Sequence, residues 1–191
     1  RPGATADNRL QRISNAARHA NEMDRRAVNT SRPILDAACG GRMFWFDKQH
    51  TGAVYMDNRT LAPTKLSNRS ILEVKPDIVA DFRDMPFDDE TFALVVFDPP
   101  HMCRAGKNSY MAQKYGCLEP DTWRDDLRAG FNECFRVLRP QGVLIFKWHE
   151  GHIPLKEVLA LAPAQPLFGN RASGKNLKTH WLCFMKMEDL E

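Results

Sequence analysis

The stretch Leu94–Phe97, followed by Asp98-Pro99-Pro100, constrains the fold more than any other part of the chain. The run is apolar and partly β-branched, which predicts a strand buried on both faces. Two consecutive prolines end such a strand, because each lacks an N–H for the sheet and has a fixed φ. Strands of this kind are typical of α/β sheets, whose ligands bind at the carboxyl ends of the strands. Asp98 and the Pro99 carbonyl are therefore candidate ligand groups, and the alternative is an ordinary turn in which Asp98 is a cap.

Length and composition favour a single cytoplasmic domain. The 191 residues suffice for one sizeable core, and we divide them into a helical N-terminal extension, 1–30, and a domain, 31–191. No apolar run approaches the roughly 20 residues that span a bilayer, so we expect no membrane association. The net charge of +3 is too small to establish a polyanionic partner. The five cysteines form no CxxC pair, which favours free thiols in a reducing compartment.

Two earlier strands also end in acidic residues. Pro33–Ala38 reads as a strand with Asp36 near its end, and it runs into Cys39-Gly40-Gly41. Glycine lets the backbone pass close to a ligand, although a tight strand-to-helix turn would need it too. Ala53–Met56 reads as a second strand, and it ends at Asp57, 21 residues after Asp36. An acid at about this distance from a glycine turn is the usual partner of a ribose diol, and the alternative is a turn or capping aspartate.

A third strand follows the same pattern. Asp77–Ala80 reads as a short strand, and Asp81 and Phe82 come directly after it. The segment Met85–Phe92 then leads into the strand that ends at Asp98. Because the carboxyl ends of parallel strands meet at one edge of a sheet, these acids are expected to lie together.

These features resemble class I methyltransferases that use S-adenosyl-L-methionine (SAM), and the resemblance runs from about Pro33 to Lys186. It implies a Rossmann-like α/β fold with a seven-stranded, mainly parallel sheet, helices on both faces and the strand order 3-2-1-4-5-7-6. It also implies that SAM is the cofactor. The residues that would bind it are Asp36, Ala38, Cys39, Gly40, Asp57, Asp81, Phe82 and Asp98.

The DPPH sequence narrows the resemblance to enzymes that methylate exocyclic amino groups, chiefly adenine N6 and cytosine N4, including small phage-type proteins. Their motif is an Asp, Asn or Ser followed by two prolines and an aromatic residue, and it implies catalytic roles for Asp98, Pro99, Pro100 and His101. Asp98 and the Pro99 carbonyl would accept the two amino N–H bonds and align the nitrogen for transfer. His101 stands where the family has an aromatic residue that stacks on the base, so it would stack as well or titrate near neutrality.

Two polar segments are candidates for substrate binding. Met102–Pro120 is long enough for a substrate lid, with a solvated loop as the alternative. The basic segment 169–178 would contact phosphates, with a solvated hairpin turn as the alternative. Trp148 would lie in the pocket wall at the end of its strand. The candidate substrate-binding residues are therefore Arg104, Lys107, Tyr110, Trp148, Arg171 and Lys175.

The remaining elements follow from periodicity and from proline or glycine positions. We expect little regular structure in 58–76 beyond one helical turn, and a helix start at Asp121, which would act as its cap. The predicted helices are part of Asn8–Ala27, then Asp121–Leu138 and Pro154–Ala162; the predicted strands are Val143–Trp148, after a turn at Gln141-Gly142, then Gln165–Phe168 and Thr179–Lys186.

The chemistry proposed needs no metal, and we expect none. On a strand, His180 and Cys183 point to opposite faces and so cannot easily share an ion. The favoured function is methylation of a nucleobase amino group, with adenine N6 in DNA as the first choice and nucleic acid as the partner. Two alternatives stay open: methylation of a small-molecule or protein amino group, and a SAM-binding accessory protein without transfer activity.

Overall fold

A computed structural model describes residues 28, 30–66, 69–104, 109–170 and 178–187. The helix predicted within Asn8–Ala27 lies outside the described residues. So do three candidate substrate-binding residues, Lys107, Arg171 and Lys175.

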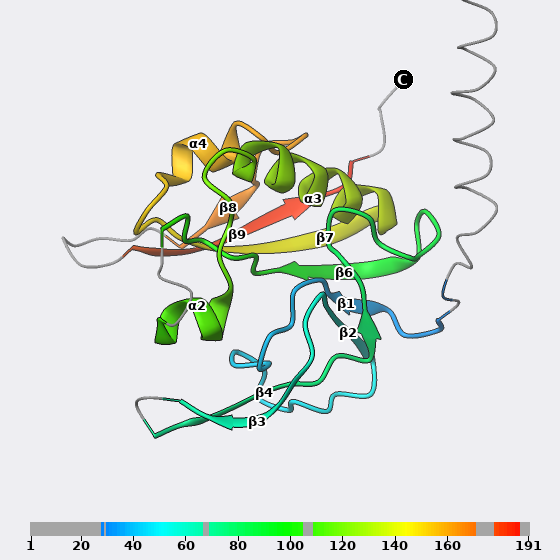
Figure 1. Cartoon of the computed structure of the whole chain (residues 1–191). Coiled ribbons are helices and arrows are strands. Elements are labelled where there is room, and N and C mark those ends of the chain that lie inside the picture. The colour runs from blue at the N-terminus through cyan, green and yellow to red at the C-terminus, as the bar shows by residue number, and fades with distance from the viewer. Residues whose placement is uncertain (1–27, 29, 67–68, 105–108, 171–177, 188–191) are drawn as a thin grey trace, which may run out of the picture.

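The described residues form a seven-stranded sheet in the order β5-β2-β1-β6-β7-β9-β8 (Figure 1). Counted along the chain, these seven strands have the order 3-2-1-4-5-7-6, so the predicted fold class is confirmed. The first five strands of this order are parallel, and β9 is antiparallel to both of its neighbours. The strands are β1 (Ile34–Asp36), β2 (Ala53–Asp57), β5 (Ile78–Val79), β6 (Phe92–Phe97), β7 (Leu138–His149), β8 (Phe168–Gly169) and β9 (Thr179–Met185).

The reversal of strand order between β1 and β6 marks the expected ligand crevice. Successive strands lead away from β1 through β2 on one side and away from β6 through β7 on the other. The register pairs Ile34 with Leu94 and Asp36 with Val96. Asp98 therefore follows β6 directly at the carboxyl edge, close to the end of β1, where ligands of open α/β sheets bind.

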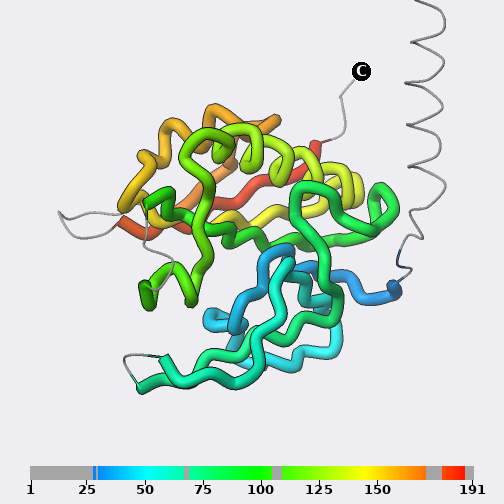
Figure 2. The backbone as a smooth tube through the Cα atoms, viewed as in Figure 1, coloured from blue at the N-terminus to red at the C-terminus, as the bar shows by residue number. Residues whose placement is uncertain are grey.

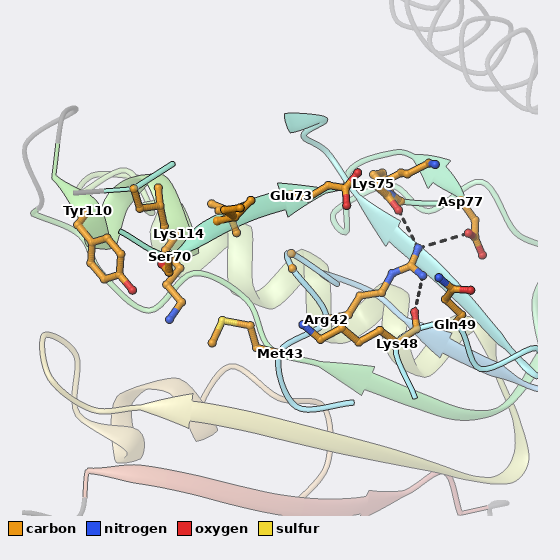
Figure 3. A pocket seen from close by; sticks show the side chains of 16 residues that line it. Arg42, Met43, Lys48, Gln49, Ser70, Glu73, Lys75, Asp77, Tyr110 and Lys114 are labelled. Atoms are coloured by element: carbon orange, nitrogen blue, oxygen red, sulfur yellow. Dashed lines mark hydrogen bonds and ion pairs between the residues drawn. The ribbon is translucent and has the colours of Figure 1, made fainter. Parts of the chain in front are cut away.

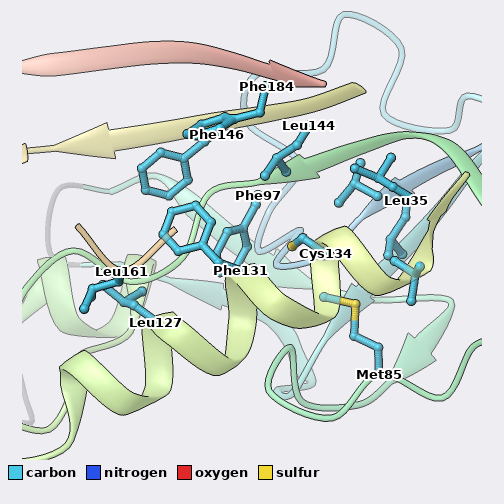
Figure 4. Close-up of a cluster of buried hydrophobic side chains, with 14 of the residues drawn as sticks. Leu35, Met85, Phe97, Leu127, Phe131, Cys134, Leu144, Phe146, Leu161 and Phe184 are labelled. Carbon is cyan, nitrogen blue, oxygen red and sulfur yellow. The ribbon is translucent and has the colours of Figure 1, made fainter. Parts of the chain in front are cut away.

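One face of the sheet carries the main core, which is covered by α3 (Trp123–Val137) and α4 (Leu155–Leu159) (Figure 1). The buried side of α3 repeats at helical spacing, as the sequence predicts. Its Phe131 ring lies 5.7 Å from that of Phe97 and 4.8 Å from that of Phe146 (Figure 4). This aromatic layer holds the helix against β6 and β7, the two strands that present Asp98 and the residues beside it.

The start of α3 differs from the prediction. The N-cap residue is Thr122 rather than Asp121, and no side chain caps the first turn. The Thr122 hydroxyl instead donates to Asp126 Oδ2 at 2.8 Å. Asp125 and Asp126 lie in the first turn, where negative charge is favourable to the helix dipole.

The strand predicted at Val143–Trp148 is longer than expected, because β7 begins at Leu138, directly after α3. The predicted turn at Gln141-Gly142 is an irregularity inside this strand. Gln141 has a positive φ of 60°, and the pairing of β6 with β7 shifts register near this point. The Gln141 N–H donates to the Lys186 carbonyl at 2.8 Å, so the chain keeps its sheet contacts through the irregularity.

The prediction of little regular structure in 58–76 is wrong. This part of the chain forms an antiparallel hairpin of β3 (Leu61–Lys65) and β4 (Ile71–Val74). Leu72 and Val74 alternate with exposed neighbours and bury their side chains together with Leu66. The hairpin lies on the opposite side of the molecule from α3 and α4 (Figure 2). Among the described residues, the connections from β1 to β2 and from β2 to β5 contain turns and this hairpin, and no helix.

The segment after the DPPH sequence also contains regular structure. A short helix, α2 (Tyr110–Tyr115), lies within the predicted lid Met102–Pro120. The Ser109 side chain caps it by accepting from the Ala112 N–H, and it ends at Gly116, which has a φ of 75°. None of the helices in the described part of the chain is both long and apolar enough to cross a membrane.

Candidate functional site

The first acid of the site, Asp36, is completely buried at the end of β1. Its Oδ2 accepts a hydrogen bond of 2.7 Å from the indole N–H of Trp45. Burial raises the pKa of Asp36 to about 7. Hydrogen bonds from the Trp45 side chain and the Ala38 backbone oppose this rise, and the charges of Asp98 and Asp57 add to it. The three acids predicted at separate strand ends therefore lie close enough to interact.

Asp57 and Gly40, both predicted to bind the cofactor, are in direct contact. The Gly40 N–H donates to Asp57 Oδ2 at 2.9 Å. Gly40 has a φ of 46°, which residues with a Cβ adopt rarely, so this turn favours glycine. Arg59 also binds the carboxylate, with its Nε 3.1 Å from Oδ1. The sequence interpretation missed Arg59.

The third strand end carries an ion pair. Arg83 Nη2 lies 2.7 Å from Asp81 Oδ2, and this hydrogen bond is the main reason that the pKa of Asp81 is lowered. The following residue, Phe82, is half-buried with its ring 5.3 Å from that of Phe97. One side of Phe82 therefore packs on the core.

A narrow cavity of about 40 Å³ joins several of the predicted residues. The predicted cofactor-binding residues Asp57 and Phe82 lie on it, and Asp98 and Pro100 bring the DPPH sequence to the same place. The remaining lining residues are Ala37, Ala38, Asn58, Arg59 and Tyr115.

Asp98 has a charged partner that the sequence interpretation missed. Lys147 Nζ lies 2.5 Å from Asp98 Oδ2, and the two side chains are only 21% and 15% exposed. Burial raises the pKa of Asp98, and the ammonium of Lys147 opposes that rise. The pairing of Phe97 with Phe146 places the next residues, Asp98 and Lys147, side by side. A lysine inside the apolar run Val143–Trp148 is the signal that could have identified this residue.

Trp148 does not line the pocket, contrary to the prediction. It is completely buried, and its indole N–H donates to the Ile153 carbonyl at 3.0 Å. Neighbouring residues on a strand point to opposite faces, so Lys147 faces Asp98 and Trp148 faces the core.

His101 is also enclosed, with only 6% of its surface exposed. Its ring lies 5.3 Å from that of His149 and 5.4 Å from that of Tyr115. Burial, with help from the charge of His149, lowers the pKa of His101 to about 4. The imidazole is therefore neutral near pH 7, contrary to the alternative that it titrates there, and a buried ring offers no free face for stacking.

Two of the other candidate substrate-binding residues, Arg104 and Tyr110, lie within the described ranges. Arg104 is exposed. Tyr110 lines a separate cleft of about 820 Å³, between the turn after β1, the β3–β4 hairpin and α2 (Figure 3). Lys114 and Met43 line the same cleft. Arg42 also lines it, and its guanidinium donates hydrogen bonds to the carbonyls of Lys48 and Lys75. No group of His, Cys, Asp or Glu side chains in the described ranges is arranged to hold a metal ion.

No family model matches the chain, and no curated protein matches it. Solved structures do resemble it. The PH0226 protein from Pyrococcus horikoshii is 19% identical over 80% of each chain, with a TM-score of 0.48. A TehB-like SAM-dependent methyltransferase from Corynebacterium glutamicum is 16% identical over 97% of this chain and 99% of its own, with a TM-score of 0.45.

A third similar structure is 1,6-didemethyltoxoflavin-N1-methyltransferase from Burkholderia thailandensis, with 1,6-didemethyltoxoflavin and S-adenosylhomocysteine bound. It is 14% identical over 98% of this chain and 93% of its own, with a TM-score of 0.47. Likenesses at this level do not assign an activity. The sheet order and the side chains of this chain itself carry the functional argument.

Proposed function

We propose that this chain is a SAM-dependent methyltransferase that acts on an exocyclic amino group of a nucleobase, with adenine N6 in DNA as the favoured target. The observation that carries the proposal is the Asp98–Lys147 pair beside Pro99, at the carboxyl edge of the sheet and next to its point of strand reversal. A carboxylate and a carbonyl on consecutive residues offer two acceptors, which suits a planar amine with two N–H bonds.

The acids at the neighbouring strand ends fit SAM. Asp57 would accept the ribose hydroxyls in place of Arg59, and the backbone at Ala38, Cys39 and Gly40 would pass beside the methionine part. Asp36, completely buried behind this backbone, would reach the ammonium group of that part only if the loop at Ala38–Gly40 moves on binding. Asp81 and Phe82 would face the adenine. When bound, SAM supplies an electrophilic methyl group on a positively charged sulfur.

The groups around Asp98 would prepare the acceptor. An exocyclic amino nitrogen is a poor nucleophile, because its lone pair is delocalised into the ring. Hydrogen bonds to Asp98 and to the Pro99 carbonyl would orient the nitrogen and stabilise the positive charge that develops on it. Lys147 would keep Asp98 ionised in spite of its burial, and so keep it an acceptor. A base within duplex DNA would have to flip out to reach these groups.

One observation favours a second candidate, a SAM-binding accessory protein that transfers no methyl group. His101 replaces the usual aromatic residue and is buried, so the DPPH sequence itself offers no stacking surface. This candidate shares the cofactor site with the first. Methyl transfer separates the two.

The test measures SAM binding by calorimetry and methyl incorporation into single-stranded DNA, duplex DNA and RNA, followed by nucleoside mass spectrometry. Asp98→Ala should abolish incorporation while SAM still binds. Asp125→Ala is the matched control, because it removes a carboxylate that is 83% exposed on α3 and should leave both readouts unchanged. SAM binding without incorporation into any polymer would favour the accessory protein, and activity retained in Asp98→Ala would refute the role of the motif.

A further inference from the structure

The proposed acceptor needs an aromatic partner that the DPPH sequence does not supply. His101 is 6% exposed and is enclosed by other rings. A planar base that presents its amino group to Asp98 would therefore have to stack elsewhere. Two other aromatic residues, Phe44 and Trp181, lie beside Lys147 of the Asp98–Lys147 pair.

Two aromatic rings flank Lys147. Its Nζ lies 5.7 Å from the ring centre of Phe44 and 5.7 Å from that of Trp181, while it is 2.5 Å from Asp98 Oδ2. Each ring centre is therefore no more than about 8.2 Å from that carboxylate oxygen, within the reach of one base that contacts both rings. Phe44 and Trp181 are only half-buried, unlike the rings of the core.

The two rings form a corner. Their centres are 5.4 Å apart and their planes meet at 87°. The Trp45 ring already stacks against Phe44, with centres 6.2 Å apart and planes at 28°. A flat ring would therefore stack on Trp181 and contact Phe44 with its edge, an arrangement that aromatic pairs favour. Lys147, on the strand paired with Trp181, closes the corner on the side of Asp98.

Hydrogen bonds fix the chain next to both rings. The Trp181 N–H donates to Asn170 Oδ1 at 2.5 Å, and Trp181 lies within the regular pairing of β9 with β7. Phe44 precedes Trp45, whose indole N–H is bonded to the buried Asp36. Trp181 therefore stands on a paired strand, and Phe44 is next to a residue bonded to the end of β1. Binding of a base would need little further ordering of these two chain segments.

We propose that Phe44 and Trp181 form the stacking surface for the acceptor ring, which makes the preferred substrate a flat heteroaromatic amine. This inference rests on the proposed function and names the residues that would select its substrate. The two rings would stack on the acceptor base, as the aromatic residue after the two prolines does in the enzymes that this chain resembles.

The kinetic test compares methyl transfer to adenine in single-stranded DNA by Trp181→Leu, Phe44→Leu and the conservative Trp181→Phe. Loss of one base–aromatic stack should raise KM about 5- to 150-fold, with a smaller change in kcat, because Asp98 and Lys147 remain. Trp181→Phe should recover most of the loss. Phe46→Leu is the matched control, since Phe46 is two residues from Phe44 and fully exposed. Unchanged KM in both leucine variants, with activity intact, would overturn the stacking surface and leave the proposed function standing.

A second measurement does not depend on turnover. Adenosine should quench part of the tryptophan fluorescence of the protein with S-adenosylhomocysteine present, and Trp181→Phe should remove that part. Quenching without methyl transfer to any substrate would retain the surface and refute the transferase. Absence of both quenching and transfer in the unaltered protein would overturn both.

Discussion

Replacing Lys147 by methionine tests how the site keeps Asp98 ionised. The change removes the ammonium 2.5 Å from Asp98 Oδ2 and keeps a side chain of similar length. Breaking a fully buried pair costs roughly 3–5 kcal/mol. Because these side chains keep 21% and 15% exposure, we expect a smaller loss of unfolding free energy, about 1–3 kcal/mol.

The loss should depend on pH. Burial already raises the pKa of Asp98 above its unfolded value of 3.8, and removal of Lys147 raises it further. A carboxyl whose folded pKa is raised destabilises the fold once the pH exceeds the unfolded pKa, and the penalty is complete above the folded pKa. The difference between the two proteins should therefore be near zero at low pH, where Asp98 is protonated in both, and should grow above the Asp98 pKa of the unaltered protein.

Urea unfolding at about pH 3, below the unfolded pKa, and at about pH 8 measures this difference. Lys156→Met, at an exposed position of α4, is the control for the loss of one surface charge. In an Asp98→Asn background, Lys147→Met should change the unfolding free energy by the same amount at both pH values, so the double variant is compared with Asp98→Asn alone. The reasoning would be refuted if Lys147→Met lowered the unfolding free energy equally at both pH values. It would also be refuted if the pH-dependent part of the loss persisted in the Asp98→Asn background. If the chain is a methyltransferase, the acidic limb of its rate profile should also move to higher pH in Lys147→Met.

Three further predictions concern the cofactor side and the core. Arg59→Ala should tighten SAM binding about tenfold in calorimetry, because SAM no longer displaces a charge-assisted bond from Asp57; weaker binding would contradict the assignment. Asp36 has a folded pKa of about 7, so the unfolding free energy should fall as the pH rises from about 4 to about 7, and Asp36→Asn should remove this slope. Gly130→Ala places a Cβ 2.7 Å from the Phe97 ring and should cost about 1–3 kcal/mol in thermal unfolding, whereas an unchanged midpoint would indicate a looser core.

The sequence predicted the features that depend on short stretches of chain. Each parallel strand near the site is visible in the sequence as an apolar run. Asp36, Asp57 and Asp98 stand at the end of such a strand or directly after it. Resemblance to a known family then supplied the strand order, which the structure confirms. The hairpin of β3 and β4 was missed because its strands are short and bury only two side chains, Leu72 and Val74.

The errors within the site have one physical origin. Adjacent residues of a strand point to opposite faces of the sheet. Whether Lys147 or Trp148 lies at the site therefore depends on which face of the sheet meets the core. Local patterns do not carry that information, because both residues are at the end of the same apolar run. The burial of His101 is of the same kind, since it depends on Tyr115 and His149 from other parts of the chain.

The sequence by itself therefore determined where strands end and which acids stand at those ends, since backbone pairing and proline chemistry act over a few residues. Only the tertiary structure decided what those acids contact. Lys147 bonds to Asp98 although the two are 49 residues apart in the sequence. Arg59 and the Gly40 N–H both donate to the carboxylate of Asp57. Such contacts follow from the register between strands and from the packing of whole elements, and these two factors decide the charge on Asp98 and the access to Asp57.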